Sequence, residues 1–133
     1  MTTFIKTYSP DAHLSVVEHK KLGINRTYFI SKLAGVEKRG GHAHKECKQY
    51  VYPISGHCDI TIDNGYEKET YRLRPERGLF LVDNLIWSEL YNFSDDCLLA
   101  VFATHPYKEK DYIRDYDEFI DLVENEEWMH AIK

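Results

Sequence analysis

The chain alternates between short runs of β-forming residues and clusters of turn residues. The runs cover residues 26–33, 50–54, 58–62, 66–73, 78–82, 86–93 and 97–104. Asp63-Asn64-Gly65 lies between two of them and is typical of a tight hairpin, because Asn and Gly tolerate the positive φ angles of the turn. Pro53 cannot donate to a β-ladder, so we expect an edge or an irregularity there. About seven short strands at this spacing predict an antiparallel sandwich or barrel.

The last part of the chain has a helical period instead. Its apolar positions are Tyr112, Ile113, Tyr116, Phe119, Ile120 and Val123. Most positions between them are Asp, Glu, Arg or Asn, which is the pattern of a helix with one buried face. We therefore predict an amphipathic C-terminal helix over about residues 111–124, lying on the sheet. No repeat or linker divides the chain, which indicates a single domain over residues 1–133.

Composition narrows the class of protein. Of the 133 residues, 43% are hydrophobic and 29% are charged, which allows a folded core without disulfides or metal. The formal net charge is −5, so there is no overall basic surface for nucleic acid. No apolar run approaches the roughly 20 residues of a membrane span, and no N-terminal stretch fits a signal peptide. We expect a cytoplasmic protein that binds neither membranes nor nucleic acid.

The cysteines agree with this location. Cys47, Cys58 and Cys97 are odd in number, widely spaced and form no Cys-x-x-Cys pair. Such a pattern is unsuited to a disulfide framework or a zinc site, so we expect three reduced and mostly buried thiols.

Candidate chemistry gathers in residues 39–49. His42 and His44 are two apart, so in a strand both imidazoles lie on the same face. Gly40 and Gly41 precede them and allow a sharp turn or a close approach of the backbone to a ligand. The two imidazoles have three interpretations: metal ligands, acid–base groups, or a hydrogen-bonded polar layer.

The spacing around the histidines resembles the first motif of the cupins. His42-x-His44 is followed after four residues by Gln49 and after six more by Gly56. This resemblance implies an all-β antiparallel jelly roll, the double-stranded β-helix, here with a C-terminal helix. Metal cupins carry Glu where this chain has Gln49, and the region of their second motif, residues 83–89, contains no His. We therefore expect no bound metal and no other cofactor.

A narrower resemblance covers most of the chain. The matching strings are Arg39-Gly-x-His-Ala-His-Lys45, Gln49, Gly78-Leu79, Ile86-Trp87-x-Glu89, Phe93-Ser94-x-Asp96-Cys97 and the segment 111–119, Asp-Tyr-Ile-Arg-Asp-Tyr-Asp-Glu-Phe. They are similar to the dTDP-sugar 3,4-ketoisomerases, the WxcM-like branch of the cupins. The family implies a metal-free isomerase that moves the keto group of dTDP-4-keto-6-deoxyglucose from C4 to C3 through an enediolate. Its product would feed dTDP-3-amino-sugar biosynthesis for lipopolysaccharide or another surface glycan. Family members are homodimers, often with an exchanged N-terminal strand.

The residues fit this chemistry. An imidazole with a pKa near 6.5 can remove a proton beside a ketone if the enediolate oxygen is stabilised as it forms. We assign His44 as the base at C3 and His42 as its partner, although their spacing does not decide the order. Tyr28 is assigned a hydrogen bond at the hexose, and Arg39 the phosphate or the sugar. Arg26 is assigned the pyrophosphate, which a guanidinium can bind in a bidentate manner.

Five further residues lie within the family motifs. Lys45, Gln49, Trp87, Ser88 and Glu89 complete the predicted substrate-binding set. Ser88 is a departure, because many members have His after the Trp. A second departure is the segment 9–14, which lacks the family's arginine. Both leave the stereochemistry of the product at C4 open, galacto or gluco.

Three other functions remain possible from the sequence. A 3,5-epimerase of the same nucleotide sugar would also use a histidine base and differs in its product. A non-catalytic nucleotide-sugar-binding cupin would bind its ligand without proton exchange. A metal-dependent cupin enzyme would contain stoichiometric metal and lose activity on chelation, and the absent second-motif His makes it the weakest of the three.

Overall fold

The computed structural model describes residues 4–5 and 14–131. The strands are β1 (Phe4–Ile5), β2 (Arg26–Ile30), β3 (Lys38–His44), β4 (Gln49–Ser55), β5 (Cys58–Asp63), β6 (Lys68–Leu73), β7 (Leu79–Val82), β8 (Trp87–Tyr91), β9 (Leu98–Ala103) and β10 (Tyr112–Ile113). The helices are α1 (His19–Leu22) and α2 (Tyr116–Ala131), with short 3₁₀ turns at Pro75–Arg77 and Glu109–Asp111.

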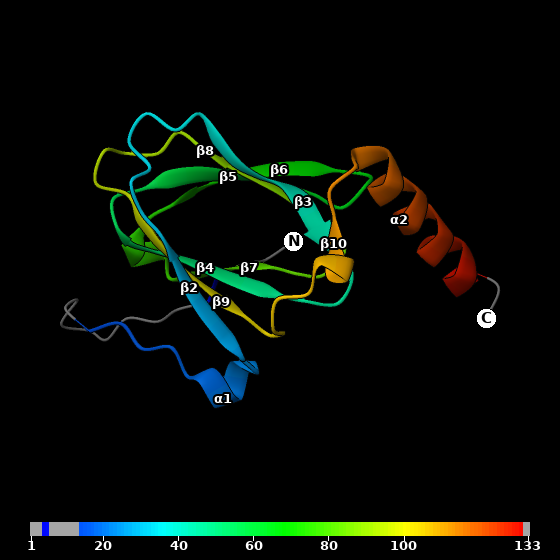
Figure 1. Cartoon of the computed structure of the whole chain (residues 1–133), viewed down its shortest axis with the longest axis horizontal. Helices are drawn as coiled ribbons and strands as arrows, with labels where there is room; N and C mark the ends of the chain where they lie inside the picture. The colour runs from blue at the N-terminus through cyan, green and yellow to red at the C-terminus, as the bar shows by residue number, and fades with distance from the viewer. Residues whose placement is uncertain (1–3, 6–13, 132–133) are drawn as a thin grey trace.

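The strands form two antiparallel sheets that face each other (Figure 1). One has the order β1-β7-β4-β9-β2, and the other has the order β10-β3-β8-β5-β6. Except for β5 and β6, neighbours in each sheet are not consecutive in the sequence, as in a jelly roll. Helix α2 extends from one end of the second sheet (Figure 1). The predicted all-β jelly roll with a C-terminal helix is confirmed.

The predicted hairpin joins β5 to β6. Asn64 donates its backbone N–H to the carbonyl of Glu67 at 3.2 Å, and Asp63 pairs with Lys68 across the two strands. Gly65 has a φ of +95°, and a Cβ there would lie 2.9 Å from Val123 of α2. Glycine is therefore required both by the turn and by the helix that packs over it.

At Pro53 the sequence predicts an edge or an irregularity, and the structure confirms the irregularity. The ladder of β4 with β9 shifts register between Pro53 and Ser55, which is the expected irregularity. The expected edge position is wrong for the strand as a whole, because β4 lies between β7 and β9. Pairing with β7 ends at Val51, however, so the missing N–H of Pro53 leaves no gap in that second ladder.

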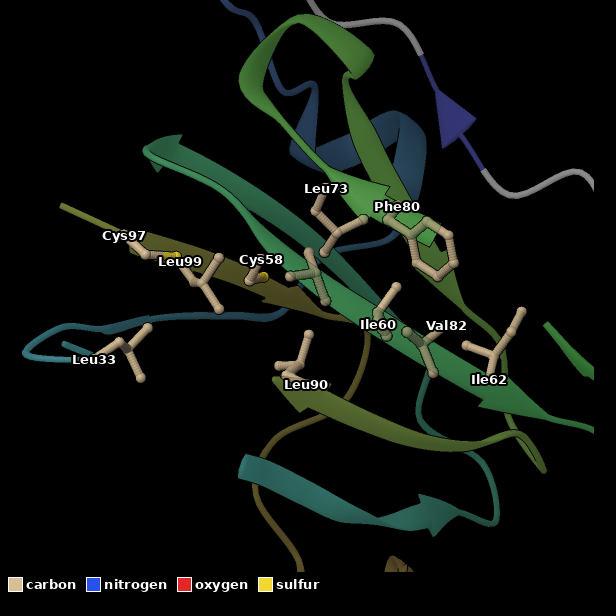
Figure 2. Packing of buried hydrophobic residues seen from close by; sticks show 11 residues of the cluster. Leu33, Cys58, Ile60, Ile62, Leu73, Phe80, Val82, Leu90, Cys97 and Leu99 are labelled. Atoms are coloured by element: carbon tan, nitrogen blue, oxygen red, sulfur yellow. The ribbon is translucent and has the colours of Figure 1, made fainter. Parts of the chain in front are cut away.

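The space between the sheets is filled by apolar side chains from both of them (Figure 2). The fully buried members include Ile60, Ile62, Leu73, Phe80 and Leu99. All three cysteines are buried free thiols, as predicted. Neither described helix is both long and apolar enough to cross a membrane.

The C-terminal helix begins five residues later than predicted, at Tyr116 rather than 111. Tyr112 and Ile113 instead form β10, which pairs with His44 and Ala43 of β3. Asp115 then ends the extended segment, because its side chain accepts the backbone N–H of Asp117 at 2.8 Å and caps the helix. Ile113 of the strand and Phe119 of the helix are buried in one cluster with Ala43. The apolar spacing therefore runs through both segments and resembles that of a single helix.

We predict that Phe119→Ala detaches α2 from the sheet. Phe119 is 0% exposed and packs against Ile113, Ala43 and Trp87, so the truncation leaves a cavity beneath the helix. The free energy of unfolding in urea should fall by about 3–5 kcal/mol. Asp121→Ala, an exposed position on the same helix, should change it by less than about 0.5 kcal/mol. Equal losses in the two variants would contradict this account of the helix.

Candidate active site

A cavity of about 320 Å³ lies between the two sheets. Alternate side chains of β2, β3, β4 and β8 face it, together with the segment that contains β10. Its polar lining consists of Arg26, Tyr28, Arg39, Gly40, His42, Gln49, Ser88, Tyr112 and Arg114. Ile30, Val51, Ile60, Val82, Leu90 and Val101 form its apolar floor. One apolar floor with several convergent polar groups is the usual form of a small-molecule site.

The two glycines before His42 shape this wall. Gly40 has a φ of +92°, and a Cβ there would lie 2.8 Å from the carbonyl oxygen of Ser88. Gly41 has a φ of +77°, and the β3–β8 ladder shifts register between Gly40 and His42. This bulge lets β3 approach β8 closely and turns His42 toward the cavity.

His42 and His44 share a face, as the spacing predicts, with ring centroids 5.1 Å apart. Their environments differ. His42 lines the cavity, whereas His44 is 4% exposed and is not part of the wall. The ring of Tyr112 contacts both, at centroid distances of 5.2 Å from His42 and 4.3 Å from His44.

Both imidazoles are held neutral. Burial lowers the pKa of His42 to about 4, and the neighbouring His44 and Arg114 add to the effect. Burial also lowers the pKa of His44, although a hydrogen bond to Asp111 opposes that shift. At neutral pH, His42 therefore presents an unprotonated nitrogen that can accept a proton.

Asp111 lies beside His44. Its Oδ2 is 3.2 Å from His44 Nδ1, and its carboxylate also accepts the backbone N–H groups of Glu46 and Cys47, at 2.8 and 3.2 Å. Burial alone would raise the pKa of Asp111, but these hydrogen bonds lower it below its ordinary value.

One group in the described part of the chain has the spacing of a metal site. The ligand atoms of His44, Cys47 and Asp111 lie within 4.8 Å of one another. The carboxylate already accepts three N–H groups, however, and the imidazole is one of the donors. This donor set fits a hydrogen-bonded histidine better than a metal centre.

Tyr28 and Gln49 form a second polar pair in the cavity. Gln49 is buried and donates its Nε2–H to the hydroxyl oxygen of Tyr28 at 2.9 Å. Burial raises the pKa of Tyr28 to about 12, so this hydroxyl keeps its hydrogen at neutral pH. Because its oxygen already accepts from Gln49, its O–H is available to donate to a ligand.

Three arginines make the cavity electropositive. Arg114 pairs with Glu109 at 2.8 and 3.1 Å, and its guanidinium lies 4.4 Å from the ring centre of Tyr112. The guanidinium of Arg26 lies 5.2 Å from the ring centre of Tyr28, and its buried Nε has no hydrogen-bond partner within the described residues. Arg39 lines the cavity and is exposed. Such forks suit a phosphate or carboxylate ligand.

Three predicted substrate-binding residues lie outside the cavity. Along β8, Ser88 and Leu90 face inward, so strand alternation turns Trp87 and Glu89 to the other face. Trp87 packs on Phe119 of α2 at 5.7 Å, and Glu89 pairs with Lys38 at 3.3 Å. Lys45 is exposed. The structure does not bring these three to the site. Of the departing segment 9–14, residues 9–13 lie outside the described residues.

The sequence prediction missed Asp111, Tyr112 and Arg114. It assigned them to the start of an outer helix, although the extended segment places them beside the histidines. A signal was present, because Tyr112 and Arg114 are two apart and both line the cavity, as residues of one strand face do.

The fold and the site define a cupin-type jelly roll whose cavity holds proton-transfer groups and cationic side chains. Residues 1–124 match the family described as "WxcM-like, C-terminal" (FdtA), and the chain belongs to that family.

Named relatives support this assignment to the family. The chain is 38% identical over 109 residues to a TDP-4-oxo-6-deoxy-alpha-D-glucose-3,4-oxoisomerase of Aneurinibacillus thermoaerophilus, a match that covers 80% of this chain and 78% of the relative. It resembles the structure of WlaRA, a TDP-fucose-3,4-ketoisomerase from Campylobacter jejuni, with a TM-score of 0.81, 32% identity and 92% and 93% of the two chains covered. The 3,4-ketoisomerase QdtA of Thermoanaerobacterium thermosaccharolyticum, in complex with TDP, gives a TM-score of 0.81, 29% identity and 93% coverage of both chains. The predicted family and the prediction of an isomerase are confirmed.

We predict that His42 titrates far below an ordinary histidine. Its imidazole proton signals, assigned by their loss in His42→Asn, should shift with a midpoint of about pH 4. An unstructured histidine peptide titrates near 6.5. Because the unfolded chain takes up this proton first, His42 should also make the protein less stable as the pH falls from about 6.5 to about 4. A midpoint near 6.5 would contradict the buried, neutral imidazole.

Proposed function

We propose that this protein moves the keto group of dTDP-4-keto-6-deoxyglucose from C4 to C3 without a metal ion. The observation that carries the proposal is the cavity itself, in which a neutral imidazole, a protonated tyrosine and cationic side chains converge. The family and the activities named for its relatives support the substrate class.

The arginines are proposed to bind the nucleotide diphosphate. Arg26 and Arg39 line the cavity, and Arg114 joins them from the segment after β10. A pyrophosphate in this position would give the buried Nε–H of Arg26 an acceptor. The hexose would then lie toward His42, Tyr28 and Gln49.

His42 is proposed as the group that takes the proton from C3. The sequence assigned this role first to His44, but only His42 lines the cavity, and the Nε2 of His44 is fully buried. An imidazole that is neutral at pH 7 is in the form needed for a base.

The oxygen at C4 becomes negative as the proton leaves C3. The hydroxyl of Tyr28 can donate to this oxygen, and the arginines lower the electrostatic cost of the charge. The C4 oxygen then takes up a hydrogen, C4 is protonated and the C3 hydroxyl loses its hydrogen, which leaves a C3 ketone and a C4 hydroxyl. In sum, one proton moves from C3 to C4 and one from the C3 oxygen to the C4 oxygen. Two protons move and no net oxidation occurs, so the reaction needs no redox cofactor.

The finer predictions belong to this proposal as well. We propose a homodimer in the cytoplasm whose 3-keto product is consumed by an amino transfer to C3. Phe29 on β2 is 63% exposed and Ile54 on β4 is 46% exposed. They provide apolar surface for a second copy on the sheet that contains both strands. We propose that the product's stereochemistry at C4 depends on the cavity around Ser88, which lines it.

The proposal is tested by an NMR time course of chelator-treated protein with dTDP-4-keto-6-deoxyglucose in deuterated water. We expect a C3 ketone to appear, with deuterium at C4, and the C4 coupling pattern to distinguish galacto from gluco. Deuterium at C3 and C5 with the ketone kept at C4 would mean an epimerase. An unchanged sugar with bound nucleotide would leave only a binding protein. Either result would overturn the proposal.

We predict that His42→Asn lowers kcat by about 10²-fold or more, the scale of a lost general base. KM should change little, because the arginines that bind the nucleotide are untouched. His19→Asn is the matched control, since His19 is exposed on α1 and lies against Phe102. Near-normal turnover in His42→Asn would remove His42 from the reaction.

A further inference from the structure

The proposed reaction leaves one half-buried, ionised group unexplained. Asp111 does not line the cavity, yet its carboxylate is held in one place by Glu46, Cys47 and His44. Its backbone carbonyl also accepts the N–H of Lys45 at 2.9 Å. Asp111 is thus attached to the turn that directly follows His44, and the imidazole and the carboxylate are fixed relative to each other.

This contact determines which nitrogen of His44 carries the hydrogen. Because the hydrogen bonds to Asp111 favour its ionised form, the carboxylate can only accept hydrogen bonds. His44 Nδ1 must therefore be the protonated nitrogen, at 3.2 Å from Asp111 Oδ2. The lone pair of the neutral ring is then on Nε2.

Nε2 of His44 is buried and has no hydrogen-bond partner among the described residues. Buried polar atoms without a partner are uncommon in proteins, so this nitrogen requires an explanation. The ring of Tyr112 lies nearest, with its centroid 4.3 Å away, and the ring of His42 follows at 5.1 Å. Of the two, His42 is the one proposed to take up a proton. When His42 takes up a proton, its ring becomes cationic and its N–H groups need acceptors.

We propose that Asp111 is a positioning residue that fixes His44 in the Nδ1–H tautomer, so that an unprotonated Nε2 and a negative charge face His42 when it becomes protonated. The opposite tautomer would point an N–H toward the cationic ring and oppose its formation. The inference rests on the proposed function, in which His42 is the proton acceptor. Asp111 acts through His44 and does not touch the substrate.

The tautomer itself is tested first, in the wild-type protein without substrate. Long-range ¹⁵N–¹H correlation spectra of ¹⁵N-labelled protein at pH 7.5 should show Nδ1 of His44 as the protonated type and Nε2 as the unprotonated type. The signals are assigned by their loss in His44→Asn. A protonated Nε2 in the wild-type protein would overturn the proposal, whatever the protein's activity.

The second test is Asp111→Asn. With its amide oxygen in the place of Oδ1, it still accepts from Glu46 and loses the bond from Cys47. Its NH₂ group then takes the place of Oδ2, donates to His44 and moves the ring hydrogen to Nε2. We expect the ¹⁵N pattern of His44 to reverse and kcat to fall about 10²-fold, with KM changed less than threefold. Wild-type kcat together with a reversed tautomer would show that the tautomer does not matter, and would also overturn the proposal.

Asp115→Asn is the matched control. Asp115 lies four residues further on and also accepts two backbone N–H groups, from Asp117 and Glu118, but it contacts neither histidine. Its amide oxygen can keep both bonds, so the variant should change neither kcat nor the His44 spectrum. Failure of the proposed function would appear differently, as absence of isomerisation by the wild-type protein with the His44 tautomer unaffected.

Discussion

The site depends on a two-residue strand pairing. β10 lies against the end of β3, where Tyr112 pairs with His44 and Ile113 with Ala43. Through this ladder the chain brings Asp111 to His44, Tyr112 to both imidazoles and Arg114 to the cavity. The same pairing buries Ile113 beneath α2, so packing of the helix and assembly of the site are stabilised together.

A second constraint is the burial of polar groups at the boundary of an apolar core. Desolvation keeps His42 and Tyr28 uncharged, and hydrogen bonds keep Asp111 ionised. The surroundings of each group, and not its residue type alone, therefore determine whether it serves as proton acceptor, proton donor or fixed charge. The apolar side chains beneath them belong to the sheets that also form the hydrophobic core (Figure 2).

Much of this arrangement could be predicted from local patterns. Strand alternation placed His42 and His44 on one face, and Asn64-Gly65 marked the hairpin. The start of the last helix was wrong because Ile113 satisfies the helical period while lying in a strand. Sequence motifs also could not separate binding from packing: Trp87 fits the family pattern, yet it supports α2. The sequence also could not show which histidine lines the cavity. That depends on Asp111 and Tyr112, whose positions come from long-range pairing.

That long-range pairing also has a consequence for synthesis of the protein. Asp111 and His44 are separated by 67 residues, and the cavity wall takes Tyr112 and Arg114 from the same late segment. A nascent chain that has emerged only as far as β9 contains both histidines and most of the two sheets, but lacks the carboxylate, the aromatic wall and one cation of the site. The complete site therefore forms only after the segment around β10 has left the ribosome and can pair with β3.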